Sequence, residues 1–284
     1  MQVEKKSNLS RAEFIKNYLK PGIPVVLTNA TKDWPGRQKF TPDFFKKNYG
    51  DKKITIVGKE YSFGEFIDLM NNSTAENPAP YPCKFDLNSH FPELMPDVLP
   101  RFEYALPDRI GNALLPKAAF PGAATLEVFL GGPGGKFPYL HYDYLHLYTF
   151  INQMYGDKEF TVYAPGQEEY LYADPQNPWK SNIENHQDPD YSKYPLFKKA
   201  TPSSVVVSQG ETMFIPCGWW HTAKSLTPSV SIALDLLNGS NWKAFRDDVK
   251  FETQKRSPLK ATLLDLYLQG AGILLSAGEK IKGY

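Results

Sequence analysis

From residue 124 onward, the chain changes to short apolar segments separated by Gly and Pro. Eight such segments can be counted, at residues 124–130, 138–143, 147–155, 159–164, 204–208, 211–215, 220–226 and 229–237. Many short strands broken by turn residues are typical of an all-β barrel or sandwich. We therefore predict two four-stranded sheets, with tight reversals at Asp157-Lys158 and Gln209-Gly210.

The first 123 residues combine helical and extended patterns in short pieces. Ser10, Thr41 and Ser62 each precede a helical pattern, as an N-cap residue does, and Glu65 completes a capping box with Ser62. Residues 72–123 are rich in Pro and Asn, which favours loops and short helices. Short strands are predicted at residues 24–27 and 53–57.

These patterns divide the chain into three parts. Residues 1–123 are predicted to form N-terminal α/β elements packed on a barrel, residues 124–240 the β core, and residues 241–284 C-terminal helices. Residues 165–203 form a polar and aromatic insert within the core. A loop of this length inside a compact domain is usually functional or disordered. We expect the insert to border the mouth of the barrel.

The composition limits the partners and the compartment. Lys and Arg number 32 against 31 Asp and Glu, so the formal net charge is +1, which disfavours nucleic acid as a partner. Cys83 and Cys217 indicate reduced thiols and hence a cytoplasmic location. The N-terminus lacks the apolar core of a signal peptide, and residues 261–278 are interrupted by Asp265, Gln269 and three glycines. We therefore expect no leader and no membrane anchor.

The residues that carry chemistry are two histidines and one aspartate. His141 and Asp143 lie two apart on a predicted strand, so both side chains point to the same face. His221 is far away in sequence, but it comes close once the sheets face each other. Two imidazoles and one carboxylate on one face of an octahedron leave three positions open, the arrangement that non-haem Fe(II) uses to activate oxygen. Taken alone, His-x-Asp is a weak signal, because a strand histidine is more often a core residue.

Other residues near this motif have ordinary structural interpretations. His146 is five residues after His141, an odd offset that turns its side chain to the opposite face of a strand. Tyr142 and Tyr144 are expected on that face too, packed in the core. His90 and His186 show no ligand spacing, and we interpret them as surface or loop residues.

The run from His141 through Lys158 to His221, with Phe214-Ile215-Pro216 and Trp219-Trp220, resembles the Jumonji C or cupin-8 family of Fe(II)- and 2-oxoglutarate-dependent oxygenases. The resemblance covers about residues 8–245. It implies a mainly β fold with flanking helices, the double-stranded β-helix or cupin-like jelly roll, with the metal at its open mouth. Residues 188–191 and 194–197 of the insert are similar to those of an asparaginyl hydroxylase of that family.

By this resemblance, His141, Asp143 and His221 are the iron ligands, and Lys158 holds the distal carboxylate of 2-oxoglutarate. A lysine suits that role because it is a compact cation. Its alternative interpretation is an exposed turn lysine. Tyr81 stands where the family often places a phenol that bonds the same carboxylate, and a core or loop tyrosine is the equal alternative.

The sequence also departs from the family pattern. Pro138 replaces a threonine that donates to the cosubstrate in the related hydroxylase, and proline has no hydroxyl. Thr149 and Asn152 are the candidates to supply the lost bond. Asp235 replaces an asparagine, and its charge would repel a dicarboxylate unless it bonds elsewhere.

The resemblance implies an oxygenase that hydroxylates a side chain of a protein or peptide, with O2 as co-reactant and succinate and CO2 as coproducts. Demethylation of an N-methyl group would pass through the same step. Two other classes stay open: a cupin that uses another divalent metal for isomerisation or ring cleavage without 2-oxoglutarate, and an inactive binding scaffold. The leucine-rich residues 259–284 either pack on the barrel or form a helical homodimer interface.

Overall fold

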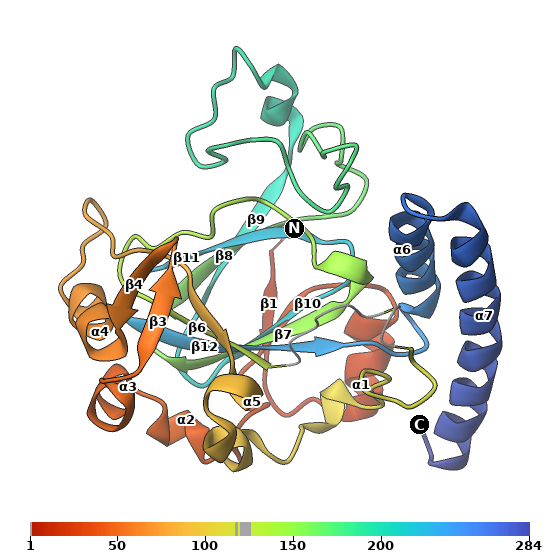
Figure 1. The fold of residues 1–284 in the computed structure, drawn as a ribbon, viewed down its shortest axis with the longest axis horizontal. Coiled ribbons are helices and arrows are strands. Elements are labelled where there is room, and N and C mark those ends of the chain that lie inside the picture. The colour runs from red at the N-terminus through yellow and green to blue at the C-terminus, as the bar shows by residue number, and fades with distance from the viewer. Residues whose placement is uncertain (1, 117–118, 120–125) are drawn as a thin grey trace.

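The protein is described here by a computed structural model that covers residues 2–116, 119 and 126–284. Its centre is a pair of facing sheets (Figure 1). The larger has the strand order β1-β2-β10-β7-β12-β6-β5 and the smaller the order β11-β8-β9. The strands of the larger sheet, in that order, are Glu4–Lys6, Val25–Leu27, Thr212–Ile215, Tyr148–Tyr155, Ser229–Leu236, Leu126–Gly131 and Cys83–Asp86. Those of the smaller sheet are Trp220–Ser225, Lys158–Tyr163 and Pro202–Val207. The predicted cupin-like jelly roll is confirmed.

Seven of the eight predicted segments are strands in the described part of the chain, while residues 124–125 of the first lie outside it. The segment 138–143 is the exception, and its prediction as a regular strand is wrong. It pairs with β11 only through two backbone hydrogen bonds, from His141 N to His221 O at 3.2 Å and from His221 N to His141 O at 2.6 Å. Just before the segment, Phe137 N donates to Ala223 O at 2.9 Å. The register shifts between these points, and Pro138 has no N–H to donate to a ladder.

The predicted pair of four-stranded sheets is also wrong, because the N-terminal part contributes strands to the larger one. β1 and β2 extend one edge and β5 the other. β5 lies in the stretch that we predicted as loops and short helices. A small separate hairpin is formed by β3, Lys53–Ile56, and β4, Lys59–Ser62.

The N-terminal helices begin at the predicted caps. Capping boxes are present at Ser10 and at Ser62, and the Thr41 hydroxyl accepts from Phe44 N. The helices in this part are α1 Arg11–Phe14, which continues as η1 Ile15–Leu19, then α2 Gly36–Lys39, α3 Pro42–Tyr49, α4 Phe63–Asn71, α5 Leu87–His90, η2 Pro92–Val98 and η3 Glu103–Ala105. Phe14 packs against Phe150 of β7 and Phe214 of β10, so the helices cover one face of the larger sheet and leave the other to the interior.

The insert has little regular structure but an apolar cluster of its own. Within the described residues, the helix of the insert is η6, Pro195–Lys199, a 3₁₀ helix of five residues. Leu171, Ile183 and Phe197 are buried together with Tyr142 and Trp220 of the barrel. The insert follows β8 and precedes β9 in the chain, and it stands beside the barrel in Figure 1.

Two helices close the chain, α6 Trp242–Gln254 and α7 Pro258–Ile281, with α6 nearer the barrel (Figure 1). The predicted C-terminal helices are confirmed, and α7 continues unbroken through the three glycines that we interpreted as interruptions of an apolar span. A Cβ at Gly272 would lie 2.2 Å from Trp242 Nε1, so this glycine permits the close contact with α6. By length and composition alone, α7 could cross a membrane. A core helix of a protein that does not cross a membrane passes the same test, so this is weak evidence for a membrane span.

Candidate metal and cosubstrate site

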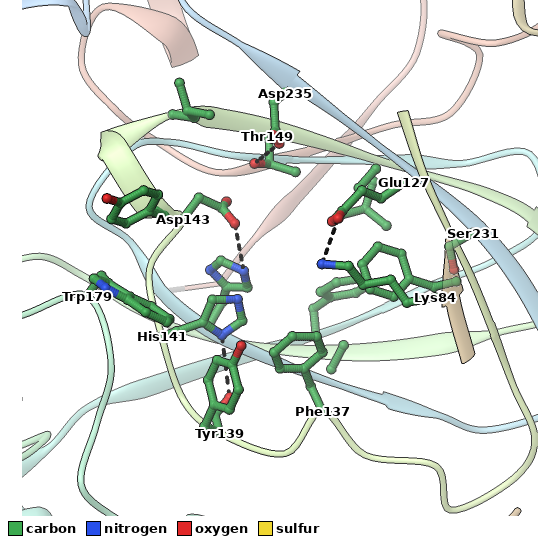
Figure 2. A pocket seen from close by; sticks show the side chains of 18 of the residues that line it. Lys84, Glu127, Phe137, Tyr139, His141, Asp143, Thr149, Trp179, Ser231 and Asp235 are labelled. Carbon is green, nitrogen blue, oxygen red and sulfur yellow. Dashed lines mark hydrogen bonds and ion pairs between the residues drawn. The ribbon is translucent and has the colours of Figure 1, made fainter. Parts of the chain in front are cut away.

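His141, Asp143 and His221 come together at one end of the barrel interior. Their ligand atoms all lie within 4.8 Å of one another, and His221 Nε2 is 3.8 Å from Asp143 Oδ1 (Figure 2). His221 lies on β11, and His141 lies in the irregular segment 138–143 that pairs with it. Asp143 ends that segment, just before the short helix η5, Tyr144–His146. This group of two imidazoles and one carboxylate is a donor set that suits a divalent iron.

The surroundings of the two histidines favour the form that binds a metal. The Nδ1 atoms face backbone carbonyls, His141 toward Tyr139 O at 3.4 Å and His221 toward Trp219 O at 3.0 Å. Since a carbonyl only accepts, Nδ1 carries the proton and Nε2 presents its lone pair. Burial, with the neighbouring His221, holds the pKa of His141 well below its usual range, so that ring stays neutral.

The three residues open onto a pocket of about 400 Å³ that is lined mainly by aromatic and charged side chains (Figure 2). Phe129, Phe137 and Phe160 form much of its apolar wall. Lys158 lies in the same pocket as the metal-ligand candidates. A concave apolar space with a few convergent polar groups is the usual form of a small-molecule site.

Lys158 is buried on β8, with 2% of its surface exposed, so the interpretation as an exposed turn lysine is wrong. Its Nζ donates to Ser231 Oγ at 2.8 Å and, more weakly, to Tyr81 OH at 3.5 Å. Among the described residues, no carboxylate lies within ion-pair distance of it. Burial lowers the pKa of Lys158 to about 7. A buried cation with only neutral partners is suited to an anionic ligand.

Tyr81 lines the pocket beside Lys158, and burial raises the pKa of its phenol, which therefore stays protonated as a donor. A Cβ at Gly131 would lie 2.6 Å from the Tyr81 ring, so this glycine makes the room for it. Thr149 also lines the pocket, and its hydroxyl donates to Asp235 Oδ1 at 3.0 Å.

The structure contradicts a cosubstrate bond from Asn152. Three residues from Thr149 on β7, it points to the other face of the sheet and is absent from the pocket lining. Its amide is already satisfied, accepting from Thr212 Oγ1 at 2.9 Å and donating to Ile232 O at 3.0 Å. Asn152 is therefore a structural residue of the sheet.

Several lining residues were missed by the sequence analysis. Lys84 and Glu127 form an ion pair of 2.6 Å that faces the pocket from β5 and β6 (Figure 2). Glu127 stands between buried Leu126 and Val128, and this alternation in an apolar strand was the available signal. Burial and the charge of Asp143 raise the pKa of Asp235 well above its ordinary value, which lessens its repulsion of a dicarboxylate.

An aromatic wall stands beside the ligand candidates. The Trp179 ring lies edge-on to Tyr139 and Tyr144, with centroids 6.0 and 5.9 Å apart. The expectation that Tyr144 packs in the core is wrong, because its ring lines the pocket and is 37% exposed. Trp179 belongs to the insert, so the insert helps to form the site.

The insert also holds the backbone of the first ligand. Tyr142 N donates to Trp179 O at 3.0 Å, and Ser181 N donates to Leu140 O at 2.9 Å. His141 is thereby paired with β11 on one side and with Lys180 of the insert on the other. The insert therefore contributes to the position of His141 as well as to the wall.

Comparison with known proteins agrees with this geometry. A family model described as a Cupin-like domain matches residues 10–236. Lysine-specific demethylase JMJ30 of Arabidopsis thaliana is 27% identical over 82% of this chain and 54% of its own length, and lysine-specific demethylase 8 of Xenopus tropicalis is 26% identical over 79% and 50%. The 2-oxoglutarate and iron-dependent oxygenase JMJD4 of Gallus gallus is 26% identical over 94% and 68%. The chain thus spans about half the length of the first two relatives.

Proposed function

This chain belongs to the family of proteins with a Cupin-like domain, and from that premise we propose that it is an Fe(II)- and 2-oxoglutarate-dependent oxygenase. The observation that carries the proposal is one pocket that holds both the His141, Asp143, His221 group and the unpaired cation of Lys158. A metal site with open positions next to a buried cation fits a chelating dicarboxylate. A relative that is named as such an oxygenase supports it.

The residues present fit both groups. His141, Asp143 and His221 would hold the iron through two neutral rings and one carboxylate. Bound iron and 2-oxoglutarate together supply the activation of oxygen, with succinate and CO2 as coproducts. Lys158 would pair with the distal carboxylate of 2-oxoglutarate, and the phenol of Tyr81, 3.5 Å from Lys158 Nζ, would donate a second bond to that carboxylate. Thr149 is the remaining candidate for a hydroxyl near the cosubstrate.

We further propose that the substrate is a side chain of a protein or peptide, which is hydroxylated. The pocket supports this proposal because its wall of Tyr139, Trp179 and Tyr144 offers aromatic faces and phenol groups to an extended chain. The relatives named as demethylases make an N-methylated side chain the main competitor, since the same step would release the methyl group.

Turnover of 2-oxoglutarate tests the proposed class directly. The purified protein with Fe(II), ascorbate and 2-oxoglutarate should release succinate in an O2-dependent manner, and a peptide library should show products that have gained one oxygen atom. Products that have lost a methyl group would identify a demethylase. Metal binding with no response to 2-oxoglutarate would favour the cupin that uses another chemistry, and the absence of both would favour a binding scaffold.

We also propose that α7 pairs with a second copy of the chain. One face of α7 leaves large apolar side chains exposed, namely Leu259, Leu263, Leu266, Ile273 and Leu274. Their size and number exceed what a solvent-facing helix needs. The mass in solution of the protein and of Leu263→Glu tests the dimer, and partition into detergent or lipid instead would overturn it.

We propose a cytoplasmic location for the protein. Cys83 and Cys217 are unpaired thiols, which agrees with a reducing compartment.

A further inference from the structure

The backbone directly after Asp143 has an unusual conformation. Leu145 and His146, in η5, have φ values of 61° and 49°, both in the left-handed region that non-glycine residues rarely adopt. These two residues turn the chain between the ligand candidate and β7. A conformation of this kind persists only where the surroundings hold it.

The turn is held by α6 and the residue before it. His146 Nδ1 lies 2.7 Å from Asp248 Oδ2 on α6, and Asn241 Nδ2 donates to His146 O at 3.0 Å. Leu145 is buried in the apolar cluster that includes Phe245 of α6. Both partners of these polar bonds, Asp248 and Asn241, lie beyond residue 236, where the match to the family model ends.

The His146 ring also borders the rear of the three ligand candidates. It packs on the Tyr142 ring, with centroids 4.6 Å apart, and Tyr142 meets Trp220 edge-on at 5.2 Å. Tyr142 stands between His141 and Asp143 in the chain, and Trp220 directly precedes His221. One layer of three rings therefore backs the segments that present all three ligand atoms.

We propose that His146 is a positioning residue for the metal site, fixed by Asp248 of α6, and that the C-terminal helices thereby take part in metal binding. The inference rests on the proposed function only in that a metal is bound at the three ligand candidates. It concerns neither the cosubstrate nor the substrate. Outer residues that orient metal ligands affect metal affinity by about 10- to 100-fold.

The chain provides a matched control for Asp248. Asp265 is also a carboxylate of the C-terminal helices, and it pairs with Arg246 at 2.6 Å between α7 and α6 without reaching the turn. Asp248→Ala removes the contact of α6 with His146, and Asp265→Ala removes the contacts of α7 with Arg246 and Lys250 of α6. Only the first should change metal binding, whereas both lower the thermal unfolding temperature.

The measurement is Mn(II) affinity by electron paramagnetic resonance, with the Co(II) absorption spectrum as a report on ligand geometry and thermal unfolding in EDTA as a report on the fold. We expect Asp248→Ala to weaken Mn(II) binding at least tenfold and to alter the Co(II) spectrum, and Asp265→Ala to leave both within twofold of wild type. His146→Gly keeps the left-handed turn without strain and so guards against loss of the fold. It should weaken Mn(II) binding as Asp248→Ala does, and the double variant should be no worse than either.

Wild-type Mn(II) affinity and an unchanged Co(II) spectrum in Asp248→Ala and His146→Gly would overturn the inference and leave the proposed function standing. A wild-type protein that binds no Mn(II) would overturn the proposed function and this inference with it. Equal weakening in Asp265→Ala would also overturn the inference, because it would reduce the effect to general loosening of α6.

Discussion

The two ends of the pocket are built differently. At the end where we propose that the cosubstrate binds, the cosubstrate end, Lys158 and Ser231 lie within the continuous strands β8 and β12. The unbroken ladder of β12 with β6 holds the backbone there, although the pairing of β12 with β7 shifts register beside Ser231. At the metal end, His141 and Asp143 lie on irregular backbone between a bulged pairing and a left-handed turn. A strand positions its side chains by itself, but an irregular segment depends on what packs against it. The metal end should therefore be sensitive to distant changes and the cosubstrate end should not.

Loss of a ligand candidate is the largest expected effect at the metal end. Asp143→Ala should abolish both Mn(II) binding and succinate formation, because two imidazoles alone leave the site one donor and one negative charge short. The unfolding temperature should stay near that of wild type, since Asp143 opposes the ionisation of Asp235. Asp188→Ala, in the insert, is the control. Undiminished succinate formation would remove Asp143 from the ligand set.

At the cosubstrate end, Lys158→Ala should weaken 2-oxoglutarate binding by at least about 2 kcal/mol, roughly 30-fold, because a buried carboxylate is left without its cation. Mn(II) affinity should not change, since Lys158 does not reach the ligand candidates. Calorimetric titration under anaerobic conditions measures both. A parallel loss of Mn(II) binding would show that the two ends are not independent.

The pKa of Lys158 gives the cosubstrate end a pH dependence. Because burial depresses this pKa to about 7, the neutral amine predominates above that pH, and affinity for 2-oxoglutarate should fall there, approaching about tenfold per pH unit. Without ligand the sign is opposite: between about pH 10.4 and about pH 7 only the unfolded chain takes up the proton, so the fold should lose stability as the pH falls across this window and lose no more below it. Lys158→Met should remove both dependences. Identical profiles in that variant would assign them to another group.

The smallest expected effect tests the support behind the metal end. Gly272→Ala places a Cβ against Trp242 and should cost about 1–3 kcal/mol of unfolding free energy. Gly270→Ala is the matched control, because its Cβ would meet nothing within 4 Å and alanine favours the helix. We expect Gly272→Ala to weaken Mn(II) binding slightly through α6, and Gly270→Ala not to. Chemical denaturation gives the stability and resonance titration the affinity.

The sequence predicted best where a local rule acts alone. The caps at Ser10 and Ser62 and the strands β7 and β12 follow from residue type and alternation, and the structure confirms them. The group of His141, Asp143 and His221 was predicted as well, although the reason given, two side chains on one face of a regular strand, is wrong.

The sequence failed where tertiary partners decide. Asn152 and Thr149 looked equivalent, and only the face of β7 separates them. The turn at His146 could not be foreseen from the sequence. Its left-handed backbone costs about 1–3 kcal/mol per residue, and the contact that stabilises it comes from Asp248, 102 residues later in the chain. The pair of Lys84 and Glu127 required the pairing of β5 with β6, which no local pattern indicates.

The backbone bonds between the insert and the ligand segment have a consequence for divergence among related chains. Trp179 lines the pocket, and its backbone carbonyl accepts the hydrogen bond from Tyr142 N. The part of the insert that lines the pocket therefore cannot be exchanged without disturbing the segment that carries His141. New substrate specificity should therefore arise more readily through substitutions in an insert of unchanged length than through insertions or deletions next to position 179.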